Sequence, residues 1–128
     1  MARSKPPQNF EMLRARGHKW MKQRMRHLSD ISTEFIDRFS HVTPLHFFEI
    51  MEQTDVNFRA YIFFVKESDI AECEANGTNE IMRTFIYQKL EEYGRGNRDE
   101  ITVDFVFDSF EHVQRDFEGN YFLRLRQR

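Results

Sequence analysis

Apolar side chains recur every three or four residues along roughly the first forty positions of the chain. Spacing of this kind places the apolar side chains on one side of a helix. Gly17 weakens the first half of the pattern, whereas Ser29 and Asp30 are favourable N-cap residues. The segment therefore predicts either one long helix or two consecutive helices, the second ending near Ser40. The apolar positions are Phe10, Leu13, Trp20, Met21, Met25, Leu28, Ile31, Phe35 and Phe39.

A short apolar helix is predicted for residues 43–53. Thr43 followed by Pro44 matches an N-cap with proline in the first helical position. The apolar residues that follow are again spaced by three, which suits one side of a helix. They are Leu45, Phe48 and Met51.

Three later segments have the composition or the period of β-strands. Residues 58–65 are rich in aromatic and β-branched side chains and lie between polar segments, which indicates a central strand. Residues 100–108 alternate between two faces, and this is the clearest strand pattern in the chain. Residues 121–126 follow the same period of two after a turn at residues 118–120, and they predict a last strand.

Helical spacing returns between these strands. Ser68 can cap a short helix that Gly77 ends, and a longer helix at residues 79–93 ends at Gly94. Ser109 begins a further turn or two of helix before the last predicted strand. If the first crossover is right-handed, the longer helix packs on one face of the sheet. That face would carry Ile101, Val103, Phe105, Phe107, Leu123 and Leu125.

This order of elements predicts an α+β fold. We expect a small, mainly antiparallel sheet of about three strands packed with four to five helices, with a long basic N-terminal helical segment. Residues 1–8 contain two adjacent prolines and are predicted to be a flexible tail. Residues 9–128 then form a single α+β domain, with a helical part at residues 9–53 and a strand-helix-strand-strand part at residues 58–128. A chain of 128 residues is long enough to bury one core without crosslinks.

The charges are segregated along the chain, although the formal net charge is only −2. Residues 1–28 contain eight Lys or Arg and one Glu, which gives a basic front of charge +7. Residues 29–120 contain eight basic and twenty acidic residues, which gives an acidic body of charge −12. The last eight residues add three arginines. Such segregation steers a charged partner, or it is satisfied within the molecule when the front docks on the body.

The basic front is the first candidate binding surface. Lys and Arg alternate there with apolar residues, so the predicted helix is basic and amphipathic. It could bind the phosphates of nucleic acid, an anionic membrane or the groove of a partner protein. Alternatively, its apolar side packs on its own domain while its basic side is solvated or faces the acidic body. The candidate residues are Arg14, Arg16, Lys19, Trp20, Lys22, Arg24 and Arg26.

The predicted sheet face opposite the helix at residues 79–93 is the second candidate surface. Aromatic rings beside guanidinium groups are the chemistry that single-stranded RNA binders use on open sheets. The carboxylates on this face argue against RNA and favour cross-strand ion pairs. The N-terminal helices could also cover this face and bury it. The candidate residues are Tyr61, Asp104, Asp108, Phe122, Arg124 and Arg126.

The sequence contains no strong catalytic or ligand-binding motif, so no catalytic residue, metal or cofactor is predicted. His41, His46 and Glu49 lie close together, but zinc requires three or four ligands and no recognised ligand motif surrounds these residues. Cys73 lies between two glutamates whose charges oppose thiolate formation, and we expect it to be a core residue.

These observations favour a small, non-enzymatic, cytoplasmic protein-interaction domain that binds a charged protein partner. An inhibitor or immunity-type protein covering a basic partner is one example, because complementary charge accelerates encounter. The partner could also be a second copy of the chain in a homo-oligomer. The alternative is a nucleic-acid-binding module that uses the basic front, and the third hypothesis is an enzyme that uses His41, His46 and Glu49.

The expected location rests on three further features of the sequence. A single cysteine fits a reducing compartment, and no apolar run approaches the roughly 20 residues of a membrane span. The basic N-terminus is not followed by the apolar run and cleavage site of a secretory signal. The Arg-rich, acid-free residues 12–28 leave a mitochondrial presequence open.

Overall fold

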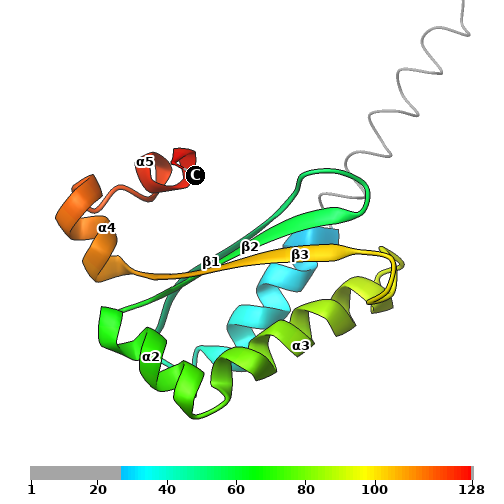
Figure 1. Ribbon diagram of the computed structural model, residues 1–128, viewed down its shortest axis with the longest axis horizontal. Coiled ribbons are helices and arrows are strands. Elements are labelled where there is room, and N and C mark those ends of the chain that lie inside the picture. The colour runs from blue at the N-terminus through cyan, green and yellow to red at the C-terminus, as the bar shows by residue number, and fades with distance from the viewer. Residues whose placement is uncertain (1–26, 128) are drawn as a thin grey trace, which may run out of the picture.

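The computed structural model describes residues 27–127, which form a three-stranded sheet with helices on both faces (Figure 1). The first described element is helical and covers residues 27–39 (the 27–39 helix). The remaining elements are β1 (Leu45–Glu52), β2 (Asn57–Phe64), α2 (Glu67–Ala75), α3 (Thr78–Glu92), β3 (Thr102–Ser109), α4 (Phe110–Phe117) and α5 (Tyr121–Arg126).

The sheet has the strand order β1-β2-β3 and is mixed. β1 and β2 form an antiparallel hairpin, whereas β2 and β3 are parallel. The parallel pair follows from the connection between them, because α2 and α3 carry the chain back to the end of the sheet at which β2 began. The predicted α+β class is confirmed, and the number of strands matches. Only β2 and β3 are predicted strands, however, and the sheet is mixed and not mainly antiparallel.

The larger core lies between the sheet and two helices, the 27–39 helix and α3. Phe35 from the 27–39 helix is fully buried and stacks on Phe48 of β1, with ring centroids 4.0 Å apart. The predicted packing of residues 79–93 against one sheet face is confirmed, since α3 shares this core with the inward side chains of β3. Members of the core include Ile31, Phe39, Ile50, Phe58, Ile62, Phe64, Met82, Ile86, Leu90, Ile101 and Val103.

A second, smaller core covers the opposite face of the sheet. α4 and α5 lie over this face, and Tyr61 and Phe63 of β2 are buried beneath them together with Val113 of α4. Figure 1 shows these two helices on the side of the sheet away from the 27–39 helix. The sheet face of the second candidate surface is therefore covered by helices. Among the described residues, the covering helices come from the C-terminal end of the chain and not from the N-terminal end.

The prediction of a helix at residues 43–53 is wrong, because the structure has β1 there. Both faces of β1 are covered, so apolar residues occur on both sides of the strand and the alternation typical of a half-exposed strand is missing. Phe48 and Ile50 face the larger core while Phe47 and Met51 face the smaller one. A register irregularity between Leu45 and Phe47 further obscures the period.

The prediction of a strand at residues 121–126 is also wrong, because these residues form α5. The Asn120 side chain accepts a hydrogen bond from the backbone N–H of Leu123 and caps the helix. Tyr121 and Leu125, one helical turn apart, pack on the smaller core, whereas Phe122 is 68% exposed. A six-residue segment whose last four residues alternate leucine and arginine fits either element, and here the cap and the packing decide.

Candidate functional site

β1 forms an open edge of the sheet, since no described strand pairs with its other side. The backbone N–H of Gln53 donates to the carbonyl of Asn57 at 2.9 Å, which makes that pair a hydrogen-bonded pair of the hairpin. Hydrogen-bonded and non-hydrogen-bonded pairs alternate along an antiparallel ladder. The backbone groups of Glu49 and Met51 therefore bond to β2, while those of Phe48 and Ile50 point toward the open edge.

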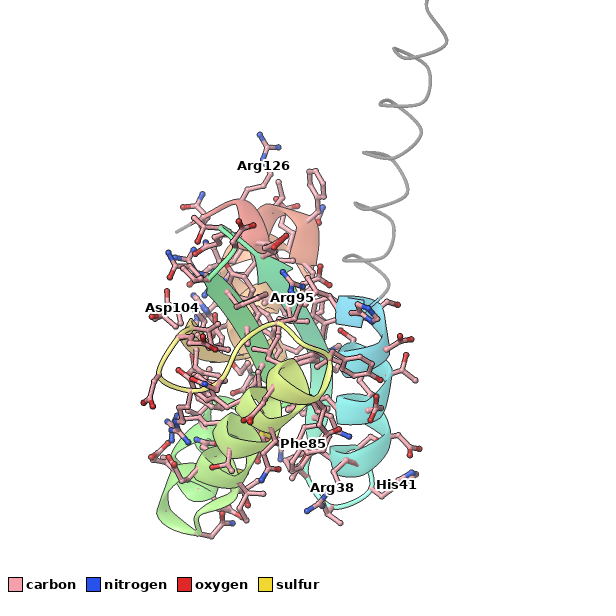
Figure 2. The ribbon with its side chains drawn as sticks, turned by 90° about the vertical axis from the view of Figure 1, so that its right-hand side faces the viewer. Arg38, His41, Phe85, Arg95, Asp104 and Arg126 are labelled. Carbon is pink, nitrogen blue, oxygen red and sulfur yellow. The ribbon has the colours of Figure 1, made fainter. Side chains whose placement is uncertain are left out.

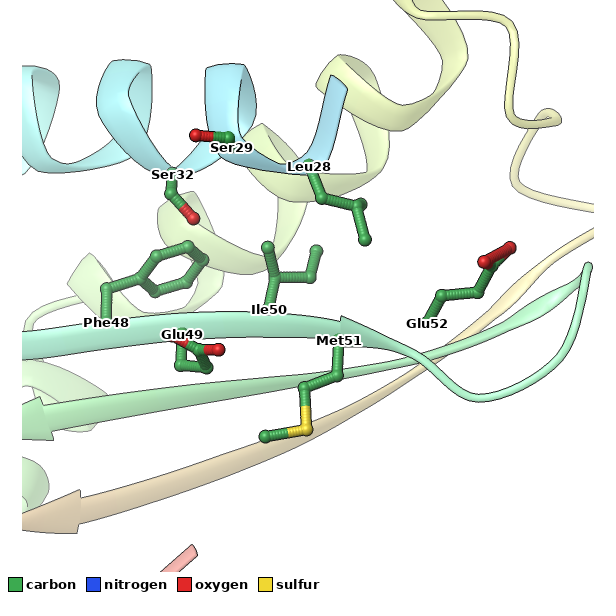
Figure 3. A pocket seen from close by; sticks show the side chains of 8 residues that line it. All are labelled: Leu28, Ser29, Ser32, Phe48, Glu49, Ile50, Met51 and Glu52. Carbon is green, nitrogen blue, oxygen red and sulfur yellow. The ribbon is translucent and has the colours of Figure 1, made fainter. Parts of the chain in front are cut away.

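A groove of about 550 Å³ runs between the 27–39 helix and this edge. Figure 3 shows Phe48 and Ile50 pointing from β1 toward the helix, with Glu49 and Met51 on the other side of the strand. The described lining residues include two carboxylates and neither Lys nor Arg. The groove thus combines an apolar floor with an acidic rim. Its described lining is Leu28, Ser29, Ser32, Phe48, Glu49, Ile50, Met51 and Glu52.

Glu49 is the unusual group of this groove. Its side chain is partly buried at the middle of β1, and burial raises the pKa of its carboxyl because the charged form loses hydration. Within the described part of the chain, its carboxylate makes no hydrogen bond or ion pair. A partly desolvated carboxylate without a compensating cation costs folding free energy, and a positively charged ligand would recover that cost.

Glu52, at the end of β1, is in a different situation. Its carboxylate pairs with the guanidinium of Arg95, which follows α3 and lies over the ring of Phe58 at 4.9 Å. The Arg95 side chain is only 8% exposed, so this pair holds the hairpin against the loop after α3. Glu52 therefore stabilises the fold, whereas Glu49 has no cationic partner among the described residues.

We expect Glu49→Gln to raise the free energy of unfolding at pH 7 by about 0.5 kcal/mol, a small gain because the side chain is only partly buried. A folded-state pKa raised above the ordinary 4.5 means that ionisation of Glu49 opposes folding at higher pH. The gain should therefore vanish as the pH falls below about 4.5, where the wild-type carboxyl is protonated in both states. Urea unfolding of both proteins at pH 7 and pH 4 measures this, and a gain that persists at pH 4 would contradict it.

A second polar cluster lies between β3, α4 and α5, around the buried carboxylate of Asp108. That carboxylate accepts hydrogen bonds from Nε of Arg124 at 2.7 Å, from Nδ1 of His112 at 2.9 Å and from the backbone N–H of Ser109 at 2.8 Å. Burial would raise the pKa of Asp108, but these three donors outweigh it and hold the pKa below the usual range. Asp108 is therefore ionised and ties α5 to β3.

The same cluster does not have the arrangement of an acid-base catalyst. Both ring nitrogens of His112 already face carboxylates, since Nε2 lies 3.0 Å from Asp116. Arg124 is largely buried against Asp108. The polar atoms are occupied by one another, and the cluster acts as a clamp that holds the C-terminal helices on the sheet.

The residues of the predicted sheet-face surface separate into three groups. Tyr61 and Asp108 are buried in the sheet beneath α4 and α5, and Arg124 of α5 donates to Asp108. Asp104 is exposed beside Arg59, which donates to it at 3.1 Å. The last two, Phe122 and Arg126, are exposed on α5, with the Arg126 guanidinium 5.5 Å from the Phe122 ring. Figure 2 shows the side chains of Asp104 and Arg126 at the surface.

The candidate residues of the basic front lie outside the described residues. They are Arg14, Arg16, Lys19, Trp20, Lys22, Arg24 and Arg26. Their role as a binding surface for a partner or for nucleic acid stays a prediction.

The histidines that the sequence places near Glu49 are not gathered around it. His46 stacks on the ring of Phe110 at 4.2 Å and is hydrogen-bonded to the Tyr121 hydroxyl at 2.7 Å. His41 lies in the turn after the 27–39 helix. Among residues 27–127, no group of three or more His, Cys, Asp or Glu is placed to hold a metal ion. Cys73 is a buried core residue, as predicted, and burial raises the pKa of its thiol, with Asp69 and Glu72 adding to the effect.

Sequence reasoning did not find the groove. The sequence placed Glu49 beside His41 and His46, as a candidate metal ligand or enzyme residue, on a predicted helix that is β1 in the structure. The signal that could have found the edge is the density of apolar residues at positions 45–51, which suits a strand buried on both faces as well as it suits a helix.

No family model, curated protein or solved structure matches this chain. The described helices include none that is long and apolar enough to cross a membrane.

Proposed function

We propose that this chain is a non-enzymatic protein-interaction domain that binds a positively charged segment of a protein partner in the groove along β1. The observation that carries the proposal is Glu49, a partly buried carboxylate that has no cationic partner among the described residues and lies beside an open strand edge. A cationic side chain placed against it would neutralise a charge that the fold leaves uncompensated.

The charge of the acidic body supports the same partner. Residues 29–120 carry a net charge of −12, although the basic front and the last three arginines bring the whole chain to −2. An acidic domain attracts a basic partner over distances of about a Debye length and orients it during encounter. We also propose the cytoplasm as the location, since a chain with one cysteine forms no internal disulfide, as is usual in reducing compartments.

Binding of a defined cationic peptide tests this proposal. The probe is an eight-residue peptide of alternating lysine and valine, as long as β1, and its control carries glutamate in place of each lysine. At about 0.05 M salt we expect the full-length chain to bind the lysine-valine peptide at least about tenfold more tightly than the control, with the difference shrinking near about 0.5 M salt. Equal binding of both peptides, or binding of neither, would refute the proposal.

A further inference from the structure

We infer that the partner segment adds to β1 as a fourth strand of the sheet, an inference that rests on the proposed function. The groove is bounded on one side by a strand edge and not only by side chains. An extended segment in this place would bond to backbone groups, so the partner is defined by its conformation as well as by its charge.

The backbone of β1 provides the pairing sites. The hairpin register pairs Glu49 with Tyr61 and Met51 with Arg59. Hydrogen-bonded pairs recur at every second residue, and both pairs lie an even number of residues from the hydrogen-bonded pair of Gln53 with Asn57. The N–H and C=O groups of Glu49 and Met51 therefore bond to β2. The N–H and C=O groups of Phe48 and Ile50, two residues apart, consequently point away from β2 toward the open edge. An added strand would find two donor and acceptor sites aligned along the open edge.

The two sides of β1 define which side chains the added strand would carry. On the side of the 27–39 helix, the edge presents Phe48 and Ile50 together with Leu28, and an apolar side chain suits this floor. On the other side it presents the carboxylate of Glu49 beside Met51, and a Lys or Arg whose stem packs on the methionine suits this rim. Successive residues of a strand point to opposite sides. The predicted partner segment therefore alternates apolar and basic residues.

A second copy of the chain fits this edge less well. Antiparallel pairing of two β1 strands, with Phe48 of one opposite Ile50 of the other, would place the Glu49 carboxylates of the two copies opposite each other, and like charges on neighbouring strands destabilise a pair. Charge thus disfavours self-association through two β1 strands and favours a basic segment as the added strand.

Backbone methylation of the lysine-valine peptide tests strand addition. One version carries N-methyl groups on the valine amides and the other on the lysine amides, with side chains and charge unchanged. In an added strand only one set of amides faces β1, so one version should bind at least about tenfold more weakly than the parent while the other binds within about twofold. Loss through the valine amides would indicate an antiparallel strand, and loss through the lysine amides a parallel one. If both versions bind like the parent, or both fail equally, strand addition is wrong.

The failure of strand addition is distinguishable from the failure of the proposed function. If the unmethylated peptide does not bind, the proposed function is wrong. If it binds and methylation shows no preference, the groove takes a cationic ligand in another manner and only the added strand is refuted.

Hydrogen exchange gives a second readout that needs no variant. On saturation with the lysine-valine peptide, we expect the amides of Phe48 and Ile50 to exchange at least about tenfold more slowly, because they gain a bonding partner. The amides of Glu49 and Met51, already bonded to β2, are the internal control and should change much less. Equal protection of all four amides would contradict strand addition. If the amides of Phe48 and Ile50 are already protected without the peptide, another segment occupies the edge. Protection that rises with protein concentration would assign the edge to a second copy. Protection that falls with added salt would assign it to the basic front of the same chain. Either result would overturn the inference.

Discussion

The Asp108→Ala variant is expected to lose about 3 kcal/mol of unfolding free energy at pH 7, because it leaves the largely buried guanidinium of Arg124 without its carboxylate. The same change removes the acceptor of His112 and of the Ser109 backbone N–H. Urea unfolding monitored by circular dichroism measures the loss. In addition, α4 and α5 should show faster amide exchange than β2, since the cluster ties them to the sheet.

Asp104→Ala is the matched control for this prediction. Asp104 projects from the same face of β3 and pairs with Arg59, but its side chain is 58% exposed. An exposed ion pair contributes at most about 1 kcal/mol, so the control should lose far less stability. Equal losses in the two variants would show that the Asp108 cluster does not clamp the C-terminal helices.

The pH dependence of Asp108 has the opposite sign to that of Glu49. The folded-state pKa of Asp108 lies below its ordinary value of 3.8, so its ionisation favours folding. This contribution is complete above pH 3.8 or so and is lost as the pH falls through the lower folded-state pKa. The stability difference between wild type and Asp108→Ala should accordingly shrink in acid.

Reversing the charge of the groove is expected to have the largest effect on binding. Glu49→Lys places a cation where the proposed partner places its own, so attraction becomes repulsion at the closest contact. We expect the affinity for the lysine-valine peptide at low salt to fall at least about thirtyfold, or roughly 2 kcal/mol. Isothermal titration or fluorescence anisotropy measures this change.

Glu72→Lys is the control for the charge reversal. Glu72 is an exposed residue of α2, an element that contributes no residue to the groove, and its reversal alters the net charge of the chain by the same amount. The loss of long-range attraction should weaken binding only a few-fold in this control. Equal losses in the two variants would mean that the peptide senses the net charge and not Glu49.

The sequence predicted those elements whose pattern has only one explanation. Residues 100–108 alternate cleanly, and β3 lies at Thr102–Ser109. Residues 79–93 have helical spacing, and α3 lies at Thr78–Glu92. β1 and α5 were missed because local pattern supports two elements in each segment and tertiary packing decides between them. In β1 both faces are covered, and in α5 a side-chain cap and two contacts to the smaller core select the helix.

The candidate site was less predictable than the fold. Its chemistry depends on β1 lying at the edge of the sheet, and strand order is not encoded in the period of any single segment. When residues 43–53 are interpreted as a helix, Glu49 is not placed on a strand at the edge of the sheet. The burial that raises the pKa of its carboxyl comes from residues distant in sequence, which composition does not reveal.

Backbone amide chemical shifts tracked while the lysine-valine peptide is added to the full-length chain test the central claim most directly. The largest changes are predicted along β1 from Phe48 to Glu52 and along the helical residues 28–32 that line the other side of the groove. Glu49→Lys should abolish these changes, whereas Glu72→Lys should preserve them. Largest changes on α3 or on α4 and α5, with β1 unaffected, would contradict the assignment of the groove as the binding site.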